Sequence, residues 1–138
     1  MNNASPPAPE LHERLEWINA DRIRLGECNG RVVALVFFNQ ASAYCHNLLE
    51  TLHHLALKHP QQLQVIGIHV PKYPFERDAE RVAEGVSRLG IRFPVASDPD
   101  YVAWQHFGIR GWPSLALVDA RGCLRQVLAG DLAQQLHV

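Results

Sequence analysis

The chain has 138 residues, a length that suits one domain with one hydrophobic core. Apolar residues make up 47% and charged residues 20%, and 13 basic residues nearly balance 14 acidic ones, giving a net charge of −1. This balance is typical of a soluble globular protein and gives no electrostatic reason to expect nucleic acid or a membrane as a partner.

The first nine residues are rich in proline and predict a flexible tail over residues 1–9, followed by one domain over residues 10–138. They have neither the basic start nor the apolar stretch of a secretory signal, so we expect a cytoplasmic protein with reduced thiols. Leu11, Leu15 and Ile18 recur at helical spacing and predict an N-terminal helix over residues 10–20.

Buried strands alternate with helical segments along the rest of the chain. Residues 32–38 are all apolar, as in a strand buried on both faces. Strands separated by helices predict a mixed α/β sheet of parallel units with an antiparallel hairpin at its end, and we expect the first and third strands to pair in parallel. The predicted elements after the first helix are a strand over 31–38, a helix over 42–59, a strand over 63–70, a helix over 76–89, a short helix from 98 to 107, and strands over 114–118 and 123–128.

The junction between the first strand and the following helix carries the segment Ser42-Ala43-Tyr44-Cys45. A redox thiol suits such a position, because the free N–H groups and the dipole of a helix N-terminus favour a thiolate. In a C-x-x-C pair the first cysteine attacks and the second resolves the mixed disulfide. In this S-x-x-C segment Ser42 takes the attacking position, so ordinary dithiol chemistry is not expected.

Several segments resemble the thioredoxin-like (redoxin) domain found at the N-terminus of NHL-repeat-containing proteins, in which C-x-x-C is usual. The most specific are Gly67-Ile68-His69-Val70-Pro71-Lys72 and Trp112-Pro113-Ser114, and the resemblance covers residues 10–130. It implies a thioredoxin-like fold, a mixed central sheet flanked by helices, with a closing helix after the hairpin. Only residues 130–138 remain for that helix, so we expect it to be short or truncated.

The resemblance also implies roles for individual residues. The Trp112–Pro113 peptide bond is expected to be cis, to lie against the loop at Ser42 and Cys45, and to help bind extended polypeptide. Cys45 and Ser42 are the catalytic candidates, and no cofactor or metal is expected. The substrate-binding candidates are Trp112, Pro113, Tyr44 and Gln40.

Ser42 and Cys45 each have a plainer interpretation as well. Ser42 suits a helix N-cap. Cys45 is either a reactive thiol or a buried apolar residue, and burial would hold its pKa at or above the free value of about 8.5. Cys28 and Cys123 are expected to be structural bystanders.

Histidines give two further expectations. His46, Glu50 and the pair His53/His54 share one helix face, which we interpret as a solvated polar surface because a metal site needs three or four ligands. His69 ends a buried strand and is expected to be a hydrogen-bonded residue of the core or its rim.

Two hypotheses of function follow. The first is a protein of the thiol-disulfide oxidoreductase type that lacks ordinary dithiol reductase activity and binds a peptide or partner protein through the groove of Ser42, Cys45 and Pro113. The alternative is a single-cysteine, peroxiredoxin-like peroxidase or monothiol redox enzyme. Ser42 and Cys45 match the end of the peroxiredoxin pattern P-x-x-x-T/S-x-x-C, although Phe38 stands at its proline, and Arg110 is the candidate for its arginine.

Overall fold

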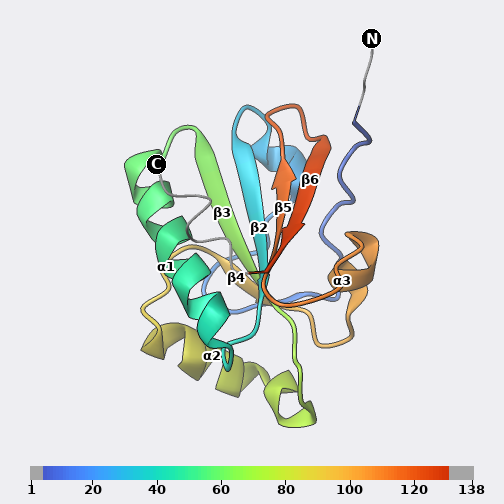
Figure 1. Ribbon diagram of the computed structural model, residues 1–138. Coiled ribbons are helices and arrows are strands. Elements are labelled where there is room, and N and C mark those ends of the chain that lie inside the picture. Colours follow the sequence, from blue (N-terminus) through green and yellow to red (C-terminus); the bar gives the residue numbers. More distant parts are fainter. Residues whose placement is uncertain (1–4, 131–138) are drawn as a thin grey trace.

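A six-stranded sheet of order β1-β4-β3-β2-β5-β6 forms the centre of the computed structural model, which describes residues 5–130 (Figure 1). The strands are β1 (Glu16–Trp17), β2 (Val32–Phe38), β3 (Leu63–His69), β4 (Val95–Ser97), β5 (Ser114–Val118) and β6 (Leu124–Ala129). The helices are α1 (Ala43–Lys58), α2 (Ala79–Arg88) and α3 (Val102–His106), with short 3-10 helices η1 (Leu25–Cys28) and η2 (Pro74–Arg77). The expected thioredoxin-like α/β fold is confirmed.

The elements predicted from long apolar runs or helical periods lie close to their expected bounds. These are β2, β3, β5 and β6 among the strands, and α1 among the helices. The helix expected over 76–89 is divided, because Asp78 adopts an extended backbone (φ −71°, ψ 119°) between η2 and α2. Its carboxylate accepts the backbone N–H of Glu80 at 3.0 Å and caps α2.

The N-terminal helix expected over residues 10–20 is wrong. Leu11 and Leu15 are buried as their spacing suggested, but β1 pairs antiparallel with β4 at the edge of the sheet. The Asn19 side chain then accepts the backbone N–H of Val95 at 2.8 Å and donates to the carbonyl of Phe93 at 2.9 Å. Bonds to the sheet therefore replace those of a helix in this segment.

The expected parallel pairing of the first and third predicted strands is also wrong. β2 pairs parallel with β3 but antiparallel with β5, with Leu35 opposite Ala116. The chain passes from β4 through α3 and enters β5 from the opposite end of the sheet (Figure 1). The hairpin of β5 and β6 is antiparallel as predicted.

The two faces of the sheet bury separate clusters, because side chains alternate along β2. Ala34, Val36 and Phe38 face α1 and α2, in a cluster that includes Cys45. Val33, Leu35 and Phe37 face the opposite side, where the N-terminal segment, η1 and α3 cover them. Cys45 and the start of α1 are therefore anchored on the first of these faces.

The ends of the described chain bear on two expectations. Part of the stretch expected to form a tail is attached to the hairpin: Ala8 donates to the carbonyl of Gly122 and Leu124 donates to that of Pro6, both at 2.9 Å. The closing helix expected over 130–138 lies outside the described residues. Among residues 5–130, none of the helices combines the length and the apolar character needed to cross a bilayer.

Candidate functional site

The start of α1 forms the first side of the site. Ser42 is the N-cap, as predicted: its hydroxyl accepts the backbone N–H of Cys45 at 3.4 Å, and its carbonyl accepts that of His46 at 3.3 Å. The helix begins here because Ser42 has an extended backbone and both its carbonyl, at 3.1 Å, and its hydroxyl accept the N–H of Cys45, which has no partner inside the helix. The serine therefore has a structural task that needs no chemistry.

Cys45 lies one turn into α1, with an exposed fraction of 0%. Burial raises the pKa of its thiol, and the N–H of Asn39 (3.4 Å from Sγ) and the Ser42 side chain only partly oppose this effect. The predicted direction is thus confirmed. Cys28, Cys45 and Cys123 are all free thiols, so the Cys45 sulfur is not joined to either of the other two.

Asn39, which was not predicted to be a site residue, links this loop to the opposite side of the site. It is buried, and its Nδ2 donates to the carbonyl of Val70 at 3.1 Å. The Nε1 of Trp112 donates to the same carbonyl at 3.0 Å. One backbone oxygen therefore connects the loop before α1 to the tryptophan that precedes Pro113. An amide residue directly after an apolar strand was the signal that could have identified it.

The Trp112–Pro113 peptide bond is cis, as the resemblance implies. Pro113 is buried and Trp112 is half-buried, with its ring 4.5 Å from that of Trp104. Ser114 Oγ donates to the carbonyl of Gly111 at 2.8 Å, which closes the turn around the proline. The tryptophan is thus the accessible part of this side, while the proline ring is covered.

The other two predicted binding residues differ in their surroundings. Tyr44 is 63% exposed. The amide of Gln40 instead lies on α2, where its Nε2 donates to the carbonyl of Arg81 at 3.5 Å and a Cβ on Gly85 would overlap its oxygen. Gln40 therefore helps to dock α2 on the loop, a role that the sequence did not suggest.

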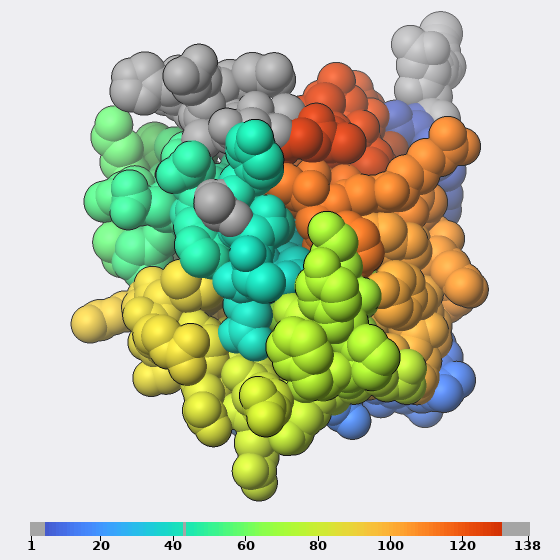
Figure 2. Space-filling view, turned by 60° about the horizontal axis from the view of Figure 1, so that its bottom comes forward, coloured from blue at the N-terminus to red at the C-terminus, as the bar shows by residue number. Residues whose placement is uncertain are grey.

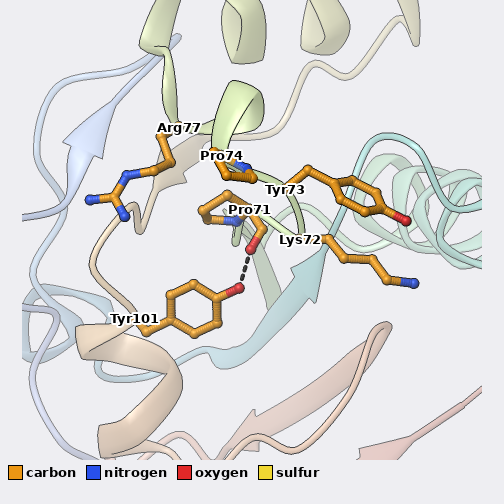
Figure 3. A pocket seen from close by; sticks show the side chains of 6 residues that line it. All are labelled: Pro71, Lys72, Tyr73, Pro74, Arg77 and Tyr101. Atoms are coloured by element: carbon orange, nitrogen blue, oxygen red, sulfur yellow. Dashed lines mark hydrogen bonds between the residues drawn. The ribbon is translucent and has the colours of Figure 1, made fainter.

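Two pockets flank the site. One of about 330 Å³ lies between the loop before α1, η2 and α2, and its lining includes Gln40, His46, Phe75 and Arg81. Figure 2 shows this end of the molecule, with the start of α1 (teal), the η2 segment (yellow-green) and α2 (yellow) side by side. The other pocket, of about 210 Å³, is lined by Pro71, Lys72, Tyr73, Pro74, Arg77 and Tyr101 (Figure 3).

Residues 71–77, which include η2, line both pockets and are called the wall below. The Tyr101 hydroxyl donates to the carbonyl of Pro71 (Figure 3), and Lys72 Nζ lies 5.9 Å from the centre of the Trp112 ring. The exposed rings of Tyr73 and Phe75 stack at 5.8 Å with an angle of 2° between their planes. This wall offers aromatic surface and a cation beside Trp112, which suits contact with a polypeptide.

His69 and Arg110 complete the predicted set. His69 is fully buried, but the expected hydrogen bond is wrong, since neither ring nitrogen has a partner within the described chain. Arg110 is exposed whereas Cys45 is buried. Among the described residues, no three His, Cys, Asp or Glu side chains are grouped so as to hold a metal ion.

Comparison with known proteins agrees with this geometry. Residues 7–127 match the model of the AhpC/TSA family. The chain belongs to this family. The AhpC/TSA domain is 33% identical over 130 residues to NHL repeat-containing protein 2 of Homo sapiens, and 33% identical over 129 residues to Protein DipZ of Mycobacterium tuberculosis. These alignments cover 89% and 90% of this chain but only 18% of each relative, so the chain spans about a fifth of their length.

Solved structures agree with the same assignment. The crystal structure of a thiol-disulfide isomerase from Corynebacterium glutamicum superposes with a TM-score of 0.78 at 26% identity, covering 94% of this chain and 92% of the other. The AhpC/TSA domain is therefore a thioredoxin-like member of the thiol-disulfide oxidoreductase family.

Proposed function

We propose that this AhpC/TSA domain binds a peptide or a partner protein at the site between Ser42, Cys45 and Trp112–Pro113, without ordinary dithiol reductase activity. The observation that carries the proposal is the state of the single motif thiol. Cys45 is fully buried, with a raised pKa, and a serine that caps α1 stands where an attacking cysteine would be. A hydroxyl in that place has no thiolate form with which to open a disulfide.

The binding half of the proposal rests on the surface around that thiol. Tyr44 is exposed on one side of the site, and Trp112 with Lys72 stands on the other. Aromatic side chains with one free face bury a large area at a low cost in conformational entropy. We propose that the partner is a polypeptide and is neither a nucleic acid nor a membrane. We also propose that the domain acts in the cytoplasm.

Restoring the missing thiol tests the catalytic half. Ser42→Cys should raise the rate of insulin disulfide reduction at least about tenfold above the unmodified protein, because it supplies the attacking thiolate at a helix N-terminus. Ser87→Cys, on the exposed face of α2, is the matched control and should stay at background. An unmodified protein that reduces insulin as fast as Ser42→Cys would overturn the proposal.

Titration with the reduced insulin B chain, an extended polypeptide, tests the binding half. Backbone amide signals of Gln40, Tyr44 and Trp112 should shift in NMR spectra, and Trp112→Ala should weaken the effect. The signals of residues 58–62, at the far end of α1, serve as the internal control and should not move. Shifts confined to those distant residues would contradict the proposed groove.

A second candidate is a peroxidase-like use of Cys45, favoured by the match to the AhpC/TSA family together with the S-x-x-C segment. It requires a thiolate that peroxide can reach, and Cys45 is buried with a raised pKa. Peroxide consumption that disappears in Cys45→Ser but survives in Cys123→Ser would place this candidate first.

A further inference from the structure

Most of the buried polar side-chain atoms without partners lie at one place outside the S-x-x-C segment. Within the described chain, such atoms on side chains occur in Gln40, His69, Glu76 and Ser97. His69 and Ser97 end β3 and β4, and Glu76 follows in η2, so these three residues lie at the carboxyl edge of the parallel strands. Buried polar groups in proteins nearly always have partners, so a concentration of this kind requires an explanation.

The sheet register brings His69 and Ser97 together. They are direct partners in the parallel pairing of β3 and β4, so both side chains project from the same face of the sheet. Phe38 flanks them on β2, with its ring 5.3 Å from the imidazole of His69. All of these side chains are fully buried. The imidazole and the hydroxyl therefore share one interior region, closed on one side by an aromatic ring.

Glu76 adds a carboxylate to this region. Its Oε1 accepts the backbone N–H groups of Lys72 at 3.0 Å and Tyr73 at 2.9 Å, whereas its Oε2 is buried without a partner. Burial lowers the pKa of His69 to about 4, and the nearby Glu76 charge opposes that shift, which places the two groups within electrostatic reach. Yet no hydrogen bond joins Glu76, His69 or Ser97 to one another in the described structure.

We infer that His69, Glu76 and Ser97 enclose an internal water site, in which bound water completes the hydrogen bonds of the three side chains. The donors and acceptors fit this ligand. A neutral imidazole offers one N–H donor and one acceptor, the serine hydroxyl offers both, and Glu76 Oε2 offers an acceptor. One water molecule can accept from Ser97, donate to Glu76 Oε2 and donate to the unprotonated imidazole nitrogen, which matches the usual three hydrogen bonds of a buried water. The imidazole N–H needs an acceptor as well, which a second water supplies.

The site has a consequence for the proposed binding surface. The other oxygen of the same carboxylate, Oε1, accepts the backbone N–H groups of Lys72 and Tyr73, which belong to the wall beside Trp112. Water bound between Glu76 and the ends of β3 and β4 would therefore fix that wall to the sheet. The inference itself does not depend on the proposed function, because it concerns only how the interior groups are satisfied.

The test begins with the unmodified full chain. A high-resolution crystal structure should contain a water oxygen within about 3.2 Å of polar atoms from at least two of the three residues. In solution, the ring protons of His69 should show NOE contacts to a long-lived water. A direct bond from the imidazole to Glu76 or Ser97, or a region without water, would overturn the inference.

Matched serine variants give a second readout. Ser97→Ala removes one partner of the water and should speed hydrogen exchange of the Lys72 and Tyr73 amides about tenfold, because the Glu76 carboxylate is then less well fixed. Ser97→Thr keeps the hydroxyl and should restore slow exchange. Ser87→Ala, on the surface of α2, should leave these amides unchanged. Equal exchange in Ser97→Ala and the unmodified chain would count against a water-held wall.

Discussion

The loop before α1 and the cluster of His69, Glu76 and Ser97 lie at the same end of the sheet, but they differ in how their polar groups are paired. Apart from the oxygen of Gln40, the side chains of the loop discussed above have partners, whereas each side chain of the cluster has a buried atom without one. In the loop, Asn39 bonds through both ends of its amide, Ser42 caps the helix, and even the thiol of Cys45 accepts an N–H. In the cluster, four side-chain atoms are buried without a protein partner.

In the loop, burial of Cys45 disfavours the thiolate. A buried region with unmatched polar groups stores unfavourable free energy unless water or a partner satisfies them. We therefore expect the loop to change little with pH and the cluster around His69 to respond to acid.

Thiol reactivity gives the most direct test of the difference between the two regions. Because Cys45 is fully buried whereas Cys123 is only half-buried, iodoacetamide should modify Cys123 about a thousandfold faster in the native protein. Peptide mass spectrometry after timed quenching measures both rates in one sample, and unfolding in urea should make them similar. If Cys45 reacts first, with a pH midpoint below about 7, the loop is an activated thiol site and the peroxidase-like candidate prevails.

Acid should act mainly through the cluster. His69 titrates near 4 in the folded chain and near 6.5 when unfolded, so only the unfolded chain gains a proton between these values. Protonation of His69 therefore leaves the free energy of unfolding unchanged above pH 6.5 and lowers it by about 3 kcal/mol as the pH falls to 4.

Urea denaturation at pH 7 and at pH 4.5 measures this loss. The His69→Leu variant should remove most of the pH dependence between these values, whereas His54→Gln, on the exposed side of α1, should retain it. The same slope in His69→Leu as in the unmodified chain would show that acid acts elsewhere and that the contrast between the two regions is mistaken.

The loop could be predicted from the sequence, whereas the cluster could not. The loop was found because an apolar strand, a capping serine and a cysteine are local patterns, and β2 and α1 are long enough to show them. The cluster was not found, because Glu76 and Ser97 become neighbours of His69 only through η2 and the pairing of β3 with β4. Tertiary contacts of this kind leave no trace in periodicity.

Some elements of the fold were likewise predictable from the sequence and others were not. β1 and β4 have two and three residues, too few for alternation to be recognised, and both were missed. The direction of β5 was predicted wrongly, because an apolar run of five residues does not show from which end the strand enters the sheet. Length and local chemistry could thus be derived from the sequence, whereas strand direction and edge pairing could not.

A smaller effect is expected from the helix caps that fix the loop and the wall. Ser42 accepts its N–H at 3.4 Å, a long hydrogen bond, whereas the Asp78 carboxylate accepts one at 3.0 Å. Ser42→Ala should cost about 0.5 to 1 kcal/mol of folding free energy and Asp78→Ala about 1 to 2 kcal/mol. Thermal and urea denaturation at pH 7 measure both. A larger loss for Ser42→Ala would mean that the serine does more than cap α1.

The contact between Gly85 and Gln40 can be tested by a substitution that should change the stability very little. Gly85 lies in α2 where a Cβ would overlap the amide oxygen of Gln40, the residue that docks the loop on that helix. Because the obstacle is the end of a flexible side chain, Gly85→Ala should expel Gln40 from α2, and the lost contact should be offset by the helix propensity that alanine adds, about 1 kcal/mol. We therefore expect a folding free energy within about 0.5 kcal/mol of the unmodified value, with a large shift of the Gln40 side-chain amide signals in NMR spectra. Gly26→Ala, where a Cβ meets only Glu10 at 3.8 Å, is the control and should leave those signals in place. A loss of more than about 2 kcal/mol would instead show that α2 and the loop form one tightly packed unit, because such a value is typical of overpacking in a core that does not yield.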